Sequence, residues 1–366
     1  MSKLRALVPM FNKAPWGGLH ENIWYSARGL RDLGWDITVA CRDGQLVENL
    51  AADGIRCHVI DDWDDWSSDA ERLSAESWDV IHGHTARSRE LGLAVAKATD
   101  TPYLNTFHGY NRDLVYRWHA SASGYVAVSR AHAAWINELP TVDDSMMLVV
   151  PNAVRDELLE QPIISFSDKI SDGVGRVVVA SRLAADKRAL LDSLRLLIGA
   201  LARVDDVRWQ VEIVGGGGEE GAVADLVAEL NSMAAHVELE MLGWVDSETV
   251  PEVMRGAVLS LASGRGAMAS LAVGTPTIAF GSQGVYGLQT GSNLDLGLWG
   301  NFGGFPLGER TVTPVVEDAL TVLSDPQRYA QVQAEGRRAA ASHLRQSDAD
   351  RLLDTAYHRC IARFGG

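Results

Sequence analysis

The feature that most constrains the fold is a regular alternation of short apolar runs with amphipathic segments, which occurs twice along the 366 residues. Runs such as LRALVPMF at 4–11 and WDITVAC at 35–41 have the length of buried strands, and the segments between them have helical period. Alternating strands and helices are typical of parallel sheets covered by helices on both faces. Because the chain is also longer than one hydrophobic core usually supports, we expect two α/β domains.

The alternation is interrupted once, which suggests where the domains divide. The segment QPIISFSDKISDGVG at 161–175 is rich in Pro, Ser, Gly and Asp and lacks helical period, as is typical of a linker. We therefore expect an N-terminal domain over 1–160, this linker, and a C-terminal domain over 176–345. We expect a last helix, over 346–366, to pack back on the N-terminal domain.

Composition excludes several classes of protein. A net charge of -15 argues against a nucleic-acid partner, because binding phosphates requires clustered Lys and Arg. The three cysteines lack metal-ligand spacing, which favours the reducing cytoplasm over a disulfide or zinc framework. No run reaches the ~20 apolar residues of a membrane-spanning helix, so we expect any membrane contact to be peripheral.

Candidate sites lie in loops that follow strands, because doubly wound sheets bind ligands beyond the carboxyl ends of their strands. Two loops are rich in glycine: Gly17-Gly18 follows the first strand, and IVGGGGEE at 213–220 follows a later one. The first is either a phosphate contact or a plain turn. The acids that follow the second would repel phosphate, so we interpret it as a turn or a sugar or base contact.

Two further loops carry cations that could bind an anion. In Gly264-Arg265-Gly266, free amides and Arg265 come together at the start of a helix. In SRLAADKR at 181–188, Arg182 and Lys187 could converge on one diphosphate. Cations at a helix start are disfavoured unless they serve an anion, so we interpret this loop as a diphosphate site.

Eight segments, in this order, resemble those of the large family of retaining glycosyltransferases with the GT-B fold. They are GGLHENIWYSARGLRDLGWDITVAC, HGHTARS, TFHG, AVSRAHAAWI, VVPNAV, SRLAADKR, IVGGGGEE and MLGWVDSETVPEVMRGA. The resemblance spans nearly the whole chain and implies two Rossmann-like doubly wound domains facing a central cleft. It also implies a nucleoside-diphosphate sugar as donor substrate, with neither a cofactor nor a metal.

The resemblance implies roles for individual residues. Arg182 and Lys187 would neutralise the leaving diphosphate, and His108 would contact the donor sugar as a hydrogen-bond partner. The other implied donor-binding residues are Gly17, Gly18, Ser181, Gly215, Gly216, Gly243, Gly264, Arg265, Gly266 and Ser270. The implied acceptor-side residues are Trp16, His84, Tyr110 and Asn152.

The sequence departs from the family at two acidic positions. Family members carry two glutamates eight positions apart, and alignment on Gly274 and Pro276 places Leu261 and Ala269 there. No Asp or Glu occurs between Glu252 and Asp295. Ser270 or water would then have to replace the contact that the second glutamate makes with ribose.

Other hypotheses remain open at this stage. Asp61-Asp62-Trp63-Asp64-Asp65 contains the Asp-x-Asp metal signature of the unrelated GT-A glycosyltransferases, although its position favours an exposed acidic loop. The leading hypothesis is a cytoplasmic glycosyltransferase acting on a glycan, lipid-linked or small-molecule acceptor. The alternatives are a catalytically impaired homologue that binds a nucleotide or a partner enzyme, and a nucleotide-sugar epimerase.

Overall fold

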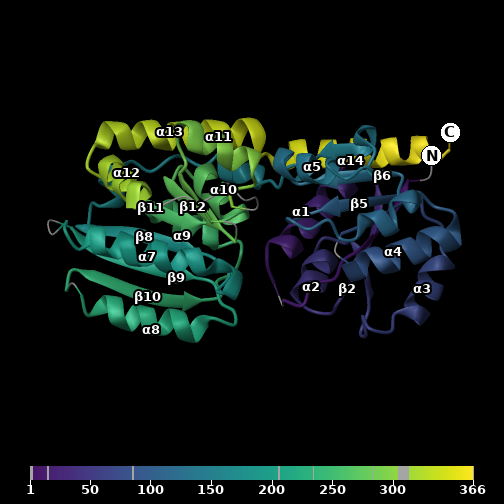
Figure 1. The fold of residues 1–366 in the computed structure, drawn as a ribbon, viewed down its shortest axis with the longest axis horizontal. Coiled ribbons are helices and arrows are strands. Elements are labelled where there is room, and N and C mark those ends of the chain that lie inside the picture. The colour runs from purple at the N-terminus through teal and green to yellow at the C-terminus, as the bar shows by residue number, and fades with distance from the viewer. Residues whose placement is uncertain are drawn as a thin grey trace. The chain divides into compact units, whose positions relative to one another are not determined.

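The structure, a computed structural model, describes residues 3–14, 16–84, 86–204, 207–233, 235–282, 284–303 and 313–365. The chain divides into two compact units, of which the first is Met1–Asn152 with Gln346–Gly366 and the second is Ala153–Arg345. Each unit has its own sheet with helices packed on it (Figure 1). The prediction of two Rossmann-like doubly wound α/β domains is confirmed.

The sheet of the first unit has seven strands in the order β3-β2-β1-β4-β5-β6-β7, paired in parallel. Their bounds are β1 (Arg5–Pro9), β2 (Asp36–Cys41), β3 (Arg56–Val59), β4 (Val80–Gly83), β5 (Tyr103–Phe107), β6 (Gly124–Ala127) and β7 (Met147–Val149). Successive side chains of a strand point to opposite faces, so Ala6 and Val8 join one core while Leu7 joins another. Burial of both faces explains the nearly continuous apolar runs.

Helices cover both faces of this sheet. One core includes side chains of α1 (Gly18–Asp32), α2 (Gln45–Ala52) and α14 (Gln346–Phe364). The opposite core includes side chains of α3 (Ser67–Ser74), α4 (Ala86–Thr99) and α5 (Arg130–Asn137). Short 3-10 helices span Val115–Arg117, His119–Ser121 and Asp144–Met146.

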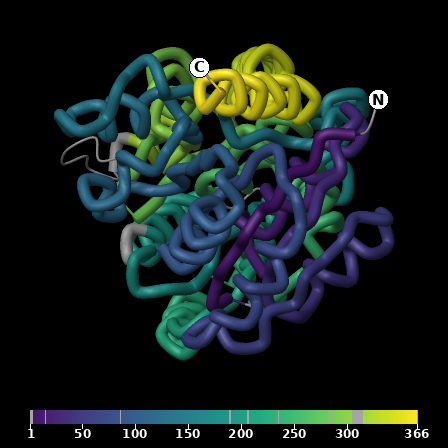
Figure 2. Tube along the Cα trace, turned by 90° about the vertical axis from the view of Figure 1, so that its right-hand side faces the viewer, coloured from purple at the N-terminus to yellow at the C-terminus, as the bar shows by residue number. Residues whose placement is uncertain are grey.

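The last helix, α14, is part of the first unit (yellow in Figure 2). It packs against α1, and the indole N–H of Trp35 donates to Asp354 Oδ1 at 2.8 Å. A Cβ atom at Gly29 of α1 would lie 2.0 Å from a carboxylate oxygen of Asp350. The missing side chain at Gly29 therefore lets the two helices approach closely.

The sheet of the second unit has six strands in the order β10-β9-β8-β11-β12-β13. Their bounds are β8 (Val174–Ala180), β9 (Arg208–Val214), β10 (Val237–Gly243), β11 (Leu259–Ala262), β12 (Thr277–Gly281) and β13 (Gly284–Leu288). The sequence pattern did not predict β13, which pairs antiparallel with β12. Gly284 and Gly287 interrupt its apolar residues, and glycine is a poor strand former.

Helices also cover both faces of the second sheet. They are α6 (Phe166–Lys169), α7 (Arg188–Leu201), α8 (Glu220–Asn231), α9 (Val250–Gly256), α10 (Arg265–Ala272), α11 (Gly291–Trp299), α12 (Thr313–Leu323) and α13 (Pro326–His343). Short 3-10 helices span Asp156–Leu159 and Ala185–Lys187. No helix in the described part of either unit has the length and apolar character needed to cross a bilayer.

The chain changes units at Asn152 and Ala153, ahead of the linker expected at 161–175. That segment instead forms α6 and the start of β8. Lys169 of α6 is buried, and its ammonium donates to the Ala257 carbonyl at 2.6 Å and to Thr275 Oγ1 at 2.9 Å. A polar composition suggested a linker here because the sequence does not show that this lysine has buried oxygen partners.

Candidate donor loops and histidine pocket

Four loops of the second unit meet at one edge of its sheet. Ala180 at the end of β8 pairs with Val214 of β9 and with Ala262 of β11, and Val214 also pairs with Gly243 of β10. The carboxyl ends of these parallel strands are therefore level, and the loops that follow them are neighbours. These loops carry most of the predicted donor-binding residues, namely Ser181, Arg182, Lys187, Gly215, Gly216, Gly243 and Gly264.

The glycine run after β9 packs directly on the loop after β8. A Cβ atom at Gly215, where φ is +126°, would lie 2.0 Å from the carbonyl oxygen of Ser181. A Cβ atom at Gly217 would lie 2.4 Å from the carbonyl oxygen of Leu183, whose N–H donates to the Gly216 carbonyl at 2.9 Å. Close backbone contact thus explains these glycines, and the run supports the neighbouring loop instead of forming an open phosphate cradle.

The loop after β10 lies at the same edge of the sheet. The carbonyl of Gly243 accepts a hydrogen bond from the Gly215 N–H at 2.7 Å. The indole nitrogen of Trp244 would lie 2.4 Å from a Cβ atom at Gly216. Gly216 and Gly243 therefore fix the backbone of the donor edge, and the Trp244 side chain beside them remains half exposed.

Lys187 connects two of the predicted anion-binding loops. Its Nζ lies 3.5 Å from Ser263 Oγ, in the loop that leads from β11 into α10. Burial lowers the pKa of Lys187, and Arg182 lowers it further while Asp186 opposes the shift. A partly buried cation near the start of a helix is well placed to bind an anion, because the helix dipole favours negative charge there.

Arg182 is paired with an acid of the same loop. Its guanidinium forms an ion pair with Asp186 at 3.1 Å, and half of its side chain, 51%, is exposed. Arg182 is still close enough to Lys187 to lower its pKa, so the two cations are neighbours although Arg182 is paired with Asp186. An exposed pair of this kind contributes only about 0–1 kcal/mol, so a phosphate that accepts two guanidinium hydrogen bonds can displace the carboxylate.

The predicted Gly264-Arg265-Gly266 loop is shorter than expected. Gly264, with φ of +52°, is the residue that precedes α10, whereas Arg265 and Gly266 already form its first turn. Ser270 lies further along α10 and is fully buried. Its hydroxyl accepts from Ser260 Oγ at 2.7 Å and donates to Met254 Sδ at 3.2 Å. The expectation that Ser270 contacts ribose is wrong, because this face of α10 packs on the sheet.

The positions aligned with the family glutamates differ in burial. Leu261 lies within β11 and is fully buried in the hydrophobic core, where a carboxylate would be costly. Ala269 is only partly buried on α10. The first polar side chain after β11 is that of Ser263, which contacts Lys187 and which the sequence analysis did not select.

In the first unit, the loop after β1 leads into α1 through the two predicted glycines. Gly17 precedes the helix and Gly18 is its first residue. A Cβ atom at Gly17 would meet nothing within 4 Å, so the backbone is accessible there. Trp16 is instead buried in the core and stacks on His20 at 5.5 Å, so it is not available to stack on an acceptor.

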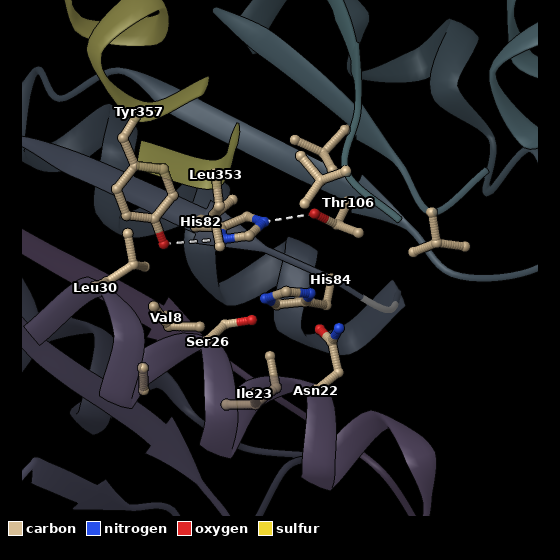
Figure 3. A pocket seen from close by; sticks show the side chains of 14 residues that line it. Val8, Asn22, Ile23, Ser26, Leu30, His82, His84, Thr106, Leu353 and Tyr357 are labelled. Carbon is tan, nitrogen blue, oxygen red and sulfur yellow. Dashed lines mark hydrogen bonds between the residues drawn. The ribbon is translucent and has the colours of Figure 1, made fainter. Parts of the chain in front are cut away.

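Three histidines of the first unit are in contact through their rings. His84 Nδ1 and His108 Nε2 share a hydrogen bond of 2.7 Å. The rings of His82 and His84 lie 4.2 Å apart. Both ring nitrogens of His82 are occupied, one by Tyr357 Oη at 3.0 Å and the other by Thr106 Oγ1 at 2.6 Å (Figure 3). His108 is thus linked through two histidines to the C-terminal helix.

These imidazoles are neutral at pH 7. Burial lowers the pKa of His82 and that of His108 to about 3, and it lowers the pKa of His84 well below the ordinary value. A base this weak is a poor proton acceptor in catalysis. The geometry therefore favours His108 as a hydrogen-bond partner of a ligand.

Two other residues predicted on the acceptor side, Tyr110 and Asn152, contact different neighbours. Tyr110 is stacked on Trp135 at a ring separation of 4.1 Å. The side-chain oxygen of Asn152 accepts a hydrogen bond from Asn22 Nδ2 at 3.2 Å. Asn22 also lines the pocket beside His84, so it connects Asn152, but not Tyr110, to that pocket.

The acidic Asp-x-Asp segment shows no sign of a metal site. Asp64 forms an ion pair with Arg87, and its N–H donates to Asp62 Oδ1 at 2.8 Å. Within the described ranges, no group of three or more His, Cys, Asp or Glu side chains could hold a metal ion.

Sequence reasoning missed His82 and Tyr357. The spacing of His82 and His84 was available as a signal, because residues two apart at a strand end point to the same face. Tyr357 had no local signal, since its hydroxyl meets His82 only after α14 packs on the first unit.

The sequence matches one family model over part of its length. Residues 16–158, which include His84 and His108, match the model described as Glycosyltransferase Family 4. No curated protein matches the chain.

Solved glycosyltransferases share the whole fold. A glycosyltransferase from Rickettsia africae is 15% identical, with a TM-score of 0.73 and 99% of each chain covered. HepE from Anabaena, solved with UDP and glucose, is 17% identical, with a TM-score of 0.74 over 96% of this chain and 98% of that one. Sucrose-phosphate synthase from Thermosynechococcus elongatus is 14% identical, with a TM-score of 0.73 over 98% of this chain and 100% of that one. Residues 16–158 therefore match glycosyltransferase family 4, and the GT-B fold of these solved structures extends through both units.

Proposed function

We propose that this protein transfers a sugar from a nucleoside-diphosphate donor to a glycan, lipid-linked or small-molecule acceptor, with retention of anomeric configuration. The observation that carries the proposal is the contact between Lys187 and Ser263 at the start of α10. It places a partly buried cation on the sheet edge where the loops after β8, β9, β10 and β11 meet. Preorganised positive charge at such a point suits a diphosphate.

A uridine nucleotide is the first donor to test. HepE was solved with UDP-glucose as well as with UDP and glucose, and TarM of S. aureus was solved in a complex that contains UDP. Retention and independence from metals follow from the family resemblance described above. We extend all three properties to this chain as part of the proposal.

The proposed mechanism depends on charge that develops on the diphosphate as the bond to the sugar breaks. Lys187 would stabilise that charge as a point cation, and Arg182 would exchange Asp186 for two phosphate oxygens. In the first unit, the open backbone at Gly17 would offer its amide to an anionic group of a ligand. His108, held by His84, would hydrogen-bond the donor sugar as a neutral imidazole.

One observation favours a second candidate, a homologue that binds a nucleotide without turnover. The positions aligned with the family glutamates are Leu261 and Ala269, and the sequence has no acid between Glu252 and Asp295. Loss of a charged hydrogen-bond acceptor costs about 1.5–3 kcal/mol, which weakens an enzyme by roughly ten- to a hundredfold without abolishing it.

Calorimetric titration with UDP and with GDP tests the proposed site. We expect Lys187→Ala to weaken binding of the preferred nucleotide by about 1–3 kcal/mol, because the ammonium would lose its phosphate partner. Arg195→Ala is the control: Arg195 is a cation of the same unit that lies in the middle of α7, where it forms an exposed ion pair with Glu229 at 3.0 Å. An unchanged dissociation constant for Lys187→Ala would remove this lysine from the site.

Turnover separates the two candidates. A glycosyltransferase should slowly hydrolyse its donor sugar without an acceptor, and Arg182→Ala should reduce that rate. A protein that binds UDP but hydrolyses no donor, and transfers no sugar to any acceptor tested, would be the impaired homologue. A protein that binds neither UDP nor GDP would contradict both.

A further inference from the structure

The first unit contains a small pocket to which the proposed donor contacts assign no ligand. It lies between α1 and the carboxyl ends of β1, β4 and β5, and its volume is about 30 Å³ (Figure 3). Its polar lining comes from Asn22, Ser26, His82, His84, Thr106 and Tyr357. A space of this size accommodates one water molecule or one group as small as a hydroxyl or hydroxymethyl, but not a sugar ring.

One polar atom in this pocket is unsatisfied. His84 Nε2 is buried and has no hydrogen-bond partner among the described residues, while Nδ1 of the same ring is bonded to His108. The His84 ring faces Ser26 and Asn22 across the pocket (Figure 3). A buried ring nitrogen without a partner costs free energy, which a bound hydroxyl or water would recover.

The neighbouring ring is fixed and cannot supply that partner. His82 uses both nitrogens, one with Tyr357 and one with Thr106. Its ring lies 4.2 Å from that of His84, which restricts the movement of the second ring. His84 Nε2 is therefore held in place toward the pocket.

The chemistry of the lining selects an uncharged group. The described residues that line the pocket include no Asp, Glu, Lys or Arg, and the remaining members are mostly aliphatic. A carboxylate or phosphate would lose its hydration here without gaining a cation. A hydroxyl both donates and accepts, so it can pair with an imidazole nitrogen in either tautomer.

We propose that His84 Nε2 binds a single uncharged hydroxyl or hydroxymethyl group of the substrate that occupies the first unit. Ser26 and Asn22 would border that group. The inference rests on the proposed function only in assigning the group to a carbohydrate or polyol. It makes the first unit selective for a neutral hydroxyl at this point, whereas the second unit binds the anionic part of the donor.

The test is nuclear magnetic resonance of the full chain labelled with ¹⁵N at histidine, in which the ring nitrogens of His84 are observed directly. Methyl α-D-glucopyranoside and glycerol are titrated as neutral probes, with glucuronate and glycerol 3-phosphate as their anionic counterparts. We expect a saturable shift of the His84 Nε2 resonance with a neutral probe and at least a tenfold weaker response with its anionic counterpart. His84→Phe should weaken binding of the neutral probe at least tenfold.

The outcomes separate this inference from the proposed function. If UDP binds and no neutral probe shifts the His84 resonances, with UDP present or absent, the pocket holds only water and the inference is overturned. An equal response to the anionic probes would also overturn it. If the neutral probes shift Nε2 but no nucleotide binds, the inference stands and the donor proposal fails. The wild-type titration decides the question even if His84→Phe does not fold.

Discussion

The two candidate sites of this protein are built in opposite ways. In the first unit, His82 and His84 are buried, neutral and packed against each other. In the second unit, Arg182 and Lys187 are charged, and Arg182 is held only by an exposed ion pair. Groups that belong to a core stabilise the fold and cannot move, whereas exposed cations can exchange partners when a ligand arrives. The comparison implies that changes in the first site affect stability as well as binding, and that changes in the second affect mainly binding.

The largest expected effect is the response to acid, which should distinguish the units. Burial lowers the pKa of His82 and of His108 to about 3 and that of His132 to about 4. A histidine in the unfolded chain has a pKa of about 6.5. Between that pH and the lower pKa of the folded state, the unfolded chain binds more protons, so the free energy of unfolding decreases as the pH falls. At pH 5 each of these histidines lowers the free energy of unfolding by about 2 kcal/mol.

We therefore expect the first unit to open before the second as the pH falls from 7 to 5. Hydrogen exchange measured by mass spectrometry reports on each unit separately, with peptides from β4 and β5 compared with those from β8 and β11. Earlier exchange in the second unit, or equal exchange in both, would contradict the assignment of buried neutral histidines.

The next largest expected effect is a difference in stability between two glutamate substitutions in the second unit, one in the core and one near the proposed ligand surface. Leu261→Glu places a carboxylate in the core of β11 and should destabilise the protein by about 3–5 kcal/mol or prevent folding. Ala269→Glu adds the same group to a partly buried position of α10 and should be tolerated within about 1 kcal/mol. Thermal unfolding of the two variants provides the measurement.

Ala269→Glu also sharpens the comparison with the family. If Ala269 occupies the position of the second glutamate, the variant should bind UDP more tightly or turn over faster than the wild type. If the variant folds and neither quantity changes, the alignment of that position loses its support.

The smallest expected effects contrast the two sites directly. Tyr357→Phe removes the hydroxyl at 3.0 Å from His82 Nδ1, leaves that nitrogen buried, and should cost about 1–3 kcal/mol. Arg182→Ala removes only an exposed ion pair and should change stability by less than about 0.5 kcal/mol. Denaturant unfolding of both variants measures the difference. A larger loss for Arg182→Ala than for Tyr357→Phe would reverse the comparison.

Local patterns were sufficient to predict most of the fold. Apolar runs of strand length, such as those at 4–11 and 35–41, predicted the parallel strands, because both faces of each sheet are buried and burial is visible in composition. The same reasoning missed β13, because its glycines interrupt the apolar run that would indicate a strand. It also predicted a linker at 161–175, where Lys169 is in fact buried. In both cases a tertiary contact outweighed local preference.

For the candidate sites, the sequence predicted only which residues lie in loops that follow strands. The sequence by itself determined that Arg182, Lys187 and the glycine run after β9 lie at the ends of strands, since strand order along the chain fixes which loops emerge at that edge. Only the tertiary structure decided that Ser270 and Trp16 face a core, that Ser263 meets Lys187, and that Tyr357 reaches His82. The physical reason is that the direction of a side chain and its partners depend on packing between segments distant in sequence, for example the 275 residues that separate His82 from Tyr357.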